Sequence, residues 1–587
     1  MVEIGCGSKA PRGLIADYAN FEKRSLNYLL KRKLMAAGSS TVLKGFALGM
    51  ALGGLASAPP AFAGQQNSWS DPPPPLTVPK ARCGQGDHTE TAGHALQGQV
   101  PAFLRATGFK GFNCNLELVG QVRGDGANWQ TDEFREHRDE LRRYQRDYGN
   151  RRDHTCAYHG TAYATTTMGT GRTQIGVPVI DMTNPSAPAP TAYLTTISML
   201  DPWESLKVNT PRQLLGADNA HNGGGGQGGP EVDFYDISVD CRYPQLLASV
   251  AVGTGADGGV PSPIFPNGHE GVWAPDGLTY YRSDLANAMY HAIDASDPSR
   301  PKEIASFNIA TALAPLTGIK SHGLSLSDDG KRAYVAVIGI PAAGYDPSTP
   351  ANNGFAVLDT SEVQARKPNA QIKLISSFLY KDGSVSQHTI PARIRGKPYI
   401  IQVDEGGSGG LNTAGWQSAC SAKVPLFPMA HIVDMSNEKK PTQVSELILE
   451  MNNPANCEQV LPDIVGLSIF TYGTHYCSVD NRENTTTLAC DEFNSGIRVF
   501  DIRDPTRPKE IAYYNPAGET TASPGSNHVT FAQWKAGGPD WCSAQLHMDA
   551  EKGTIWTTCQ DNGLLSLKFT NGVWPFPETS TPPGKQN

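Results

Sequence analysis

Histidine is the residue type whose spacing most strongly suggests chemistry in this chain. Six histidines recur at one position in a predicted series of repeats: His154, His269, His322, His388, His475 and His547. Several imidazoles that converge on one point can bind zinc, copper or iron. For one Cu, Fe or Zn ion, the predicted ligands are His269, His322, His388 and His547. His154 and His475 share the repeat position and are predicted to be structural residues or further ligands.

A structural role accounts for the same repetition. A histidine that recurs once per repeat can tie neighbouring repeats together, and the Ser-x-Asp-Gly turn at Ser327 offers hydrogen-bond partners. An imidazole near its ordinary pKa of roughly 6.5 also suits general acid–base catalysis. The sequence leaves these three alternatives open.

Two acidic pairs end predicted strands at matching positions, Asp404-Glu405 and Asp491-Glu492. They are compatible with calcium binding or acid–base work, and solvated strand ends are the simpler interpretation. The chain has no H-E-x-x-H or P-loop motif, and no catalytic residue can be assigned.

A short phrase recurs six times and defines the repeats: apolar residues, Asp, a polar turn and Pro. It reads VIDMTNPSAP from Val179 and VFDIRDPTRP from Val499. Asp can hydrogen-bond the backbone of the turn that follows, and Pro presets its φ. The repeat aspartates are therefore predicted to be structural: Asp181, Asp236, Asp294, Asp359, Asp434 and Asp501.

Predicted strands flank each phrase. A strand pair joined by a turn precedes it, as in HEGVWAPDGLTYYRSD from His269, and another strand follows the Pro. Four strands per repeat indicate an all-β propeller of antiparallel blades, whose first strands line a central channel. We count seven blades, with six or eight as alternatives. LELVGQV from Leu116 is predicted to complete the last blade, so that the terminal strands close the ring.

The V-I-x-D-x-(S/T)-(N/D)-P-x-x-P phrase resembles the LVIVD-repeat family of bacterial exported β-propellers. The resemblance covers residues 114–572. It implies the propeller fold and export. It implies no particular reaction, because the family has no general assigned activity.

The remaining segments are accessory. Residues 1–63 are predicted to be a leader with a basic cluster at Lys31, an apolar run from Gly45 and a cleavage motif at Ala61-Phe62-Ala63, with a short membrane anchor as the alternative. The other predicted segments are a Pro-rich linker and N-terminal extension (64–113), a charged helical insertion (131–153) and a C-terminal tail (573–587).

The chain has 11 cysteines, and removing the leader with Cys6 leaves an even number, as expected for disulfides in an oxidising compartment. Three pairs are predicted: Cys477/Cys490, Cys542/Cys559 and Cys420/Cys457. The formal net charge of −8 argues against nucleic-acid binding. No apolar run reaches the roughly 20 residues of a membrane span.

Two functions are compatible with these features. The first is an exported platform in the periplasm, at the cell surface or in the medium, which binds a small molecule or an envelope protein. The second is a metal-dependent oxidase, oxygenase or hydrolase with channel-mouth histidines as ligands. The lack of a catalytic motif favours the first and leaves open whether the protein is an enzyme.

Overall fold

A computed structural model describes most of the chain beyond the predicted leader. The described residues are 77–127, 129–136, 154–160, 175–219, 232–250, 268–339, 345–409, 413–464, 467, 470–523 and 537–576. The predicted leader lies outside them, as do parts of the predicted linker and tail.

Seven antiparallel sheets of four or five strands form a seven-bladed β-propeller, which confirms the predicted fold. The first three blades are β3 (Thr131–Arg135), β4 (Thr155–His159), β5 (Val177–Asp181) and β6 (Ala189–Leu194); β7 (Lys207–Asn209), β8 (Leu214–Asp218), β9 (Val232–Asp236) and β10 (Gln245–Val250); and β11 (Gly268–Trp273), β12 (Thr279–Asp284), β13 (Met289–Asp294) and β14 (Lys302–Asn308). The next two are β15 (Lys320–Leu326), β16 (Arg332–Ile338), β17 (Asn353–Asp359) and β18 (Lys373–Tyr380); and β19 (Gly383–Ile394), β20 (Lys397–Gly407), β21 (Ala430–Asp434) and β22 (Thr442–Glu446).

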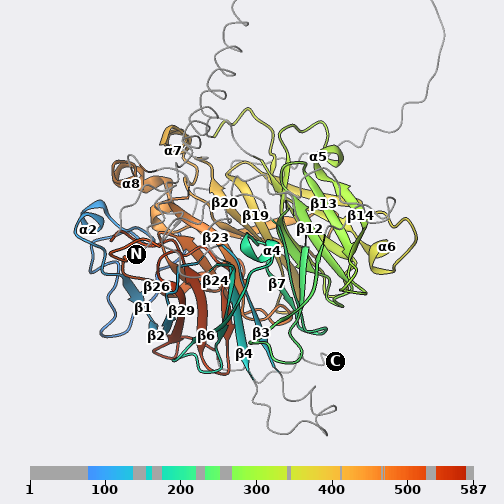
Figure 1. The fold of residues 1–587 in the computed structure, drawn as a ribbon. Helices are drawn as coiled ribbons and strands as arrows, with labels where there is room; N and C mark the ends of the chain where they lie inside the picture. Colours follow the sequence, from blue (N-terminus) through green and yellow to red (C-terminus); the bar gives the residue numbers. More distant parts are fainter. Residues whose placement is uncertain are drawn as a thin grey trace, which may run out of the picture. The chain divides into compact units, whose positions relative to one another are not determined.

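The N-terminal segment closes the ring through the last two blades. Blade six contains β23 (Tyr472–Val479), β24 (Thr487–Phe493), β25 (Ile497–Asp501) and β26 (Lys509–Asn515), and blade seven contains β27 (His547–Asp549), β28 (Thr554–Cys559) and β29 (Gly563–Phe569). As predicted, β2 (Leu116–Val122) pairs with β29 as the outer strand of blade seven. A strand not predicted from the sequence, β1 (Phe112–Cys114), adds to β26. Figure 1 shows these four strands side by side.

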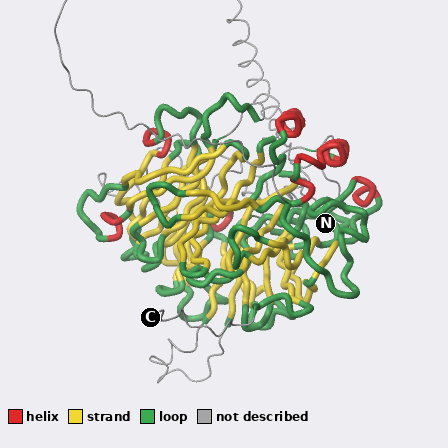
Figure 2. The backbone as a smooth tube through the Cα atoms, turned by 180° about the vertical axis from the view of Figure 1, so that it is seen from behind, coloured by secondary structure: helices red, strands yellow, loops and turns green. Residues whose placement is uncertain are grey.

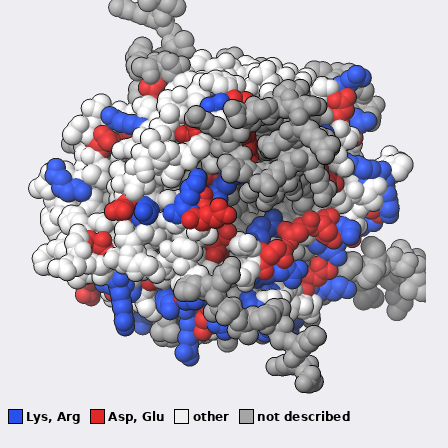
Figure 3. Space-filling view, turned by 90° about the horizontal axis from the view of Figure 1, so that it is seen from below, with Lys and Arg blue, Asp and Glu red and all other residues white. Residues whose placement is uncertain are grey.

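The repeat aspartates end the third strand of six blades. In each, Oδ1 accepts the backbone N–H two residues further on, at 2.7 to 3.1 Å. This contact bends the chain toward the outer strand. Arginines also pair with them, for example Arg503 with Asp501 at 2.9 Å and Arg332 with Asp359 at 3.5 Å. Figure 3 shows basic and acidic side chains interspersed over one face of the molecule.

The predicted helical insertion is wrong at its start. Thr131–Arg135 forms β3, the innermost strand of blade one, and residues 137–153 lie outside the described part. The charges of this strand are paired rather than solvated, because Asp132 accepts the Val208 N–H at 2.7 Å and Glu133 pairs with Arg135 at 2.5 Å. His154 consequently precedes the second strand of its blade and not the first.

Short helices lie outside the sheets, one before the first strand and the others in the connections between strands (Figure 2). They are α2 (Ala102–Ala106), α4 (Ile197–Leu200), α5 (Ile309–Ala312), α6 (Ser361–Gln364), α7 (Thr413–Ala422) and α8 (Cys457–Asp463), with 3-10 turns η1 (Glu450–Asn452) and η2 (Pro454–Asn456). Among the described residues, no helix has the length and apolar character needed to cross a membrane.

Five disulfides connect the ten cysteines after the predicted leader. The three predicted pairs are confirmed, and the others are Cys83–Cys114 and Cys156–Cys241. Cys477 and Cys490 face each other across β23 and β24, whereas Cys420–Cys457 joins α7 to α8. Disulfides of this number are typical of an oxidising compartment.

Candidate metal centre in the central channel

The inner strands bring three histidines and two glutamates to one point. His269 lies on β11, His322 on β15 and His475 on β23. Glu405 comes from β20, and Glu204 stands just before β7. All five residues are buried, with exposed fractions between 1% and 8%. Two groups of possible metal ligands result, and they share Glu204.

The distances within the cluster suit coordination of a cation. Glu204 Oε2 lies 3.2 Å from His269 Nε2 and 3.8 Å from His322 Nε2. Glu204 Oε1 lies 3.2 Å from His475 Nε2. Glu405 Oε1 is 3.3 Å from His322 Nε2, and its Oε2 is 3.2 Å from His475 Nε2. Ligand atoms that bind one ion at about 2.0–2.2 Å lie roughly 3–4 Å apart, so these spacings fit.

Backbone carbonyls orient two of the imidazoles. His322 Nδ1 lies 2.9 Å from the carbonyl of Gln387, and His475 Nδ1 bonds the carbonyl of Ser543. When Nδ1–H donates to a carbonyl, the Nε2 lone pair of a neutral imidazole faces the glutamates. Metal-binding histidines are held in this way by the residues behind them.

Glu204 carries a buried oxygen whose hydrogen bonding is incomplete. Among the described residues, Glu204 Oε2 receives no hydrogen bond of regular geometry; its contacts are the Nε2 atoms of His269 and His322 at 3.2 and 3.8 Å, and the residue is only 1% exposed. A buried polar atom without a partner costs free energy. A cation at this point would remove that cost, so the residues present fit a metal ion.

Without a cation, the carboxylates hold protons on the same imidazoles. Burial alone lowers a histidine pKa, but Glu204 and Glu405 outweigh it and raise the pKa of His322 to about 9 and that of His475 to about 10. Burial opposes ionisation of Glu204, yet the three histidines hold its pKa well below the ordinary value. Two imidazolium charges thus offset two carboxylates, and one divalent ion carries the same charge.

Bulges in the inner strands aim these histidines at the channel. The register of the first strand pair shifts around each of them: between Gly268 and Gly271, between Ser321 and Leu324, and between Tyr472 and Tyr476. An extra residue in a strand redirects its side chain, and such bulges are common beside functional sites.

The structure does not bring His388 into this cluster. In blade five the register shifts between Ser386 and His388, so the unpaired residue is Gln387. Gln387 Nε2 lies 2.9 Å from Glu204 Oε1 and 3.1 Å from His475 Nε2. His388 instead stacks on Tyr476 with ring centroids 4.6 Å apart, and burial lowers its pKa to about 3.

His547 and His154 also lie outside the cluster. His547 stacks on Trp556 and its Nε2 is 2.9 Å from the hydroxyl of Thr131 in blade one, a tie between neighbouring blades. His154 faces Thr183 and Asp181 of its own blade. Of the four predicted ligands, only His269 and His322 come together, and His475 joins them.

We expect acid to destabilise the fold through His388. Its folded pKa of about 3 lies below the ordinary 6.5, so between these values the unfolded chain binds more protons and stability falls as pH falls. The loss from pH 6.5 to about pH 5 is roughly 2 kcal/mol. Urea unfolding at both pH values should show a shallower pH dependence for His388→Gln. Equal pH dependence in both proteins would contradict this account.

Sequence reasoning missed Glu204 and undervalued Glu405. Blade two has no histidine at the repeat position, and Glu204 occupies that place. Its backbone N–H donates to the His269 carbonyl at 3.2 Å, and Glu204 and Glu270 form an isolated parallel β-bridge. Its position ahead of the first hairpin of blade two was the available signal.

The two acidic pairs are not solvated strand ends, so that interpretation is wrong. Asp404, Glu405, Asp491 and Glu492 are all buried, between 0% and 8% exposed. Burial raises the pKa of Glu492 to about 8, whereas the neighbouring His322 and His475 lower that of Glu405 against the effect of burial.

Because Gly323 has no side chain, the strand next to His322 can lie close to Glu270 and to the backbone of Gln387. A Cβ at Gly323 would lie 2.1 Å from Glu270 Oε2 and 2.4 Å from the carbonyl oxygen of Gln387. We therefore expect Gly323→Ala to cost about 1–3 kcal/mol, measured by urea unfolding. Because the displaced carbonyl also orients His322, metal affinity should fall too. Unchanged stability would show that Glu270 moves aside freely.

Aromatic side chains cover the histidines on one side. Trp129 lies 4.9 Å from His475, and Trp203 lies 6.1 Å from His269, between ring centroids. Trp129 also packs in one apolar cluster with Phe493. Such a wall lowers the local dielectric and strengthens the electrostatic interactions beneath it.

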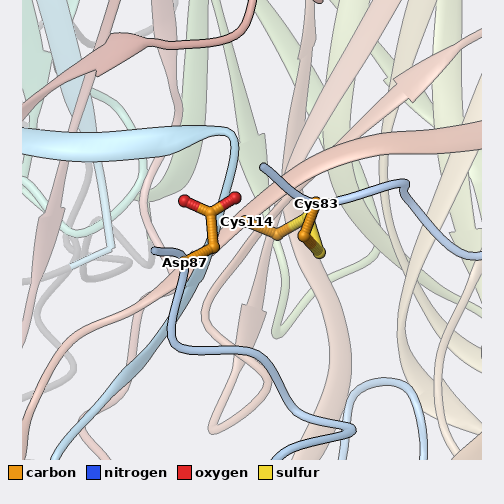
Figure 4. Close-up of side chains that lie close together, drawn as sticks. All are labelled: Cys83, Asp87 and Cys114. Carbon is orange, nitrogen blue, oxygen red and sulfur yellow. A yellow bond between two sulfur atoms is a disulfide. The ribbon is translucent and has the colours of Figure 1, made fainter. Parts of the chain in front are cut away.

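A third group of potential ligands, Cys83, Asp87 and Cys114, has another role. The two cysteines are joined in a disulfide, as Figure 4 shows, so no thiolate is available. The Asp87 carboxylate accepts the N–H groups of Gly84 and Asn115 at 2.8 and 2.9 Å. This group fastens the N-terminal extension.

Comparison with known proteins adds little to the geometry. No family model and no curated protein matches the chain. Solved structures similar to it include a putative 6-phosphogluconolactonase of Bacteroides uniformis (10% identity, TM-score 0.43, 72% of this chain and 94% of that one). Hydrazine synthase of Kuenenia stuttgartiensis (11%, 0.42, 71% and 92%) and a protein from Lactobacillus plantarum (10%, 0.41, 68% and 87%) are also similar. Likenesses this distant say nothing about what this chain binds or converts.

Proposed function

We propose that this chain is an exported metal-dependent enzyme whose centre is formed by Glu204, His269, His322, Glu405 and His475. One observation carries the proposal: three imidazole Nε2 atoms converge on two buried carboxylates within about one ligand–ligand spacing of one another. Unusual clusters of buried ionisable groups are candidates for functional sites.

The donor set narrows the choice of metal. Three imidazole nitrogens with carboxylate oxygens suit iron or zinc, and no thiolate or thioether is present in the cluster to favour Cu(I). When bound, zinc would supply Lewis-acid chemistry for hydrolysis, and iron would supply redox chemistry for an oxidase or oxygenase. The five side chains would hold the ion, and the aromatic wall would restrict water.

A purely structural role explains the cluster less well. His547 shows what a structural histidine does in this fold: its Nε2 lies 2.9 Å from the hydroxyl of Thr131 and ties blade seven to blade one. Burying several charges costs several kcal/mol per ion unless they are fully paired. The ring is already closed by the pairing of β2 with β29 and of β1 with β26, so it does not need the central cluster for closure.

Export is part of the proposal. The predicted leader and the LVIVD-repeat resemblance support it, and five disulfides are compatible with it. The expected substrate is a small molecule, because the cluster is buried rather than displayed on a surface.

Elemental analysis of the exported protein, purified without an affinity metal, tests the proposal. We expect at least one Fe or Zn per chain in the wild type and at least one ion fewer in His269→Ala/His322→Ala. His388→Gln is the matched control, since this histidine is equally buried but lies outside the cluster. Lack of metal in the wild type, even after it is supplied with Fe, Zn and Cu, would refute the proposal.

A further inference from the structure

We infer that the channel binds two metal ions, which share Glu204 and Glu405 as bridging ligands. This inference rests on the proposed function and adds the number of ions to it. The first position is bounded by Glu204 Oε2, His269 and His322, and the second by Glu204 Oε1, Glu405 Oε2 and His475.

Both carboxylates are oriented as bridges. Glu405 presents Oε1 to His322 at 3.3 Å and Oε2 to His475 at 3.2 Å. Glu204 does the same, with Oε2 toward His269 and His322 and Oε1 toward His475. A carboxylate that serves a single ion does not need to offer its two oxygens to opposite histidines.

The number of donors also exceeds what one ion accepts. Three Nε2 atoms and four carboxylate oxygens surround the cluster, whereas zinc and iron sites in proteins take four to about six ligands. Two ions roughly 3.5–4 Å apart can divide the seven donors and still leave open positions for a substrate. Paired carboxylate-bridged ions are known from histidine- and glutamate-rich sites in other folds.

Gln387 is placed to complete the second position. It is fully buried, and its amide nitrogen lies 2.9 Å from Glu204 Oε1 and 3.1 Å from His475 Nε2. Its oxygen, Oε1, has no hydrogen-bond donor among the described residues. Rotation of the amide by half a turn exchanges the two atoms and directs the oxygen at the second ion. Gln387 also lies at the bulge of its strand, as the three histidines do in theirs.

Manganese titration with a spectroscopic measurement tests the inference. Metal-depleted protein is titrated with Mn(II), and bound metal is counted by elemental analysis while electron paramagnetic resonance reports coupling between ions. We expect two Mn(II) per chain with an exchange-coupled spectrum. Glu405→Gln and His475→Gln should each bind one uncoupled ion at the His269/His322 position, and His388→Gln should behave as the wild type.

The outcomes separate this inference from the proposed function. One tightly bound ion in the wild type would overturn the second position and leave the metal-dependent function standing. Two ions without exchange coupling would place them too far apart and would also overturn the inference. No bound ion would overturn both.

Discussion

Glu204→Gln will lower the affinity for metal by at least about 100-fold, a larger effect than any other single substitution in the cluster. Glu204 is the one residue common to both groups of ligands, and the substitution removes a negative charge and one strong oxygen donor together. Loss of residues that merely support metal ligands costs 10–100-fold, so loss of a shared ligand should reach or exceed that range. Competition with a chromogenic chelator measures the affinity.

Glu270→Gln is the matched control for this prediction. Glu270 is also buried in the channel, but it accepts the Tyr476 hydroxyl at 3.0 Å and belongs to neither ligand group. The affinity of the Glu270→Gln variant for metal should stay within a few-fold of the wild-type value. If Glu204→Gln bound metal as tightly as Glu270→Gln, the cluster would not be the metal site.

Arg498→Met will destabilise the fold by about 3–5 kcal/mol, the range for one partner removed from a buried ion pair. Arg498 is 0% exposed and its Nη1 lies 2.9 Å from Glu510 Oε1 and 3.2 Å from Glu90 Oε2. Without it, two buried carboxylates lose their counter-charge. Because Glu90 belongs to the N-terminal extension, hydrogen exchange should also rise across residues 77–115. Urea unfolding gives the free energy.

Arg503→Met provides the comparison. Arg503 pairs with Asp501 at 2.9 Å, but its side chain is 38% exposed, so its loss should cost less than about 1 kcal/mol. Arg498→Met combined with Glu90→Gln and Glu510→Gln should recover part of the stability. If Arg498→Met and Arg503→Met lost equal amounts of unfolding free energy, the buried ion pairs of Arg498 with Glu90 and Glu510 would not hold the N-terminal extension in place.

The fold could be predicted because its signals are local. Each repeat aspartate and the proline after it specify one turn, and hairpin turns at positions such as Asp329-Gly330 separate the strands. The closing strand from Leu116 was recognisable because blade seven lacked an outer strand. The strand at Thr131 was missed because its charges suggested a solvated helix, and only the partners of Asp132 and Glu133 in neighbouring strands explain why these side chains are partly buried.

The candidate site could be predicted only in part, because single-residue bulges decide which side chain faces the channel. His388 and Gln387 are adjacent, and the register shift before His388 directs Gln387 to the cluster. Glu405 reaches it from a second strand, and no repeat pattern distinguishes it from Asp404. Such choices depend on pairing between strands rather than on the order of residues.

Anomalous diffraction at the absorption edge of the bound metal tests the metal centre most directly. Crystals of protein supplied with Fe or Zn should show anomalous density among the Nε2 atoms of His269, His322 and His475 and the carboxylates of Glu204 and Glu405, and none at His388. Density at another place, or none at all in metal-supplied crystals with the histidines bonded directly to the glutamates, would contradict the account. The cluster would then be a buried network of ion pairs.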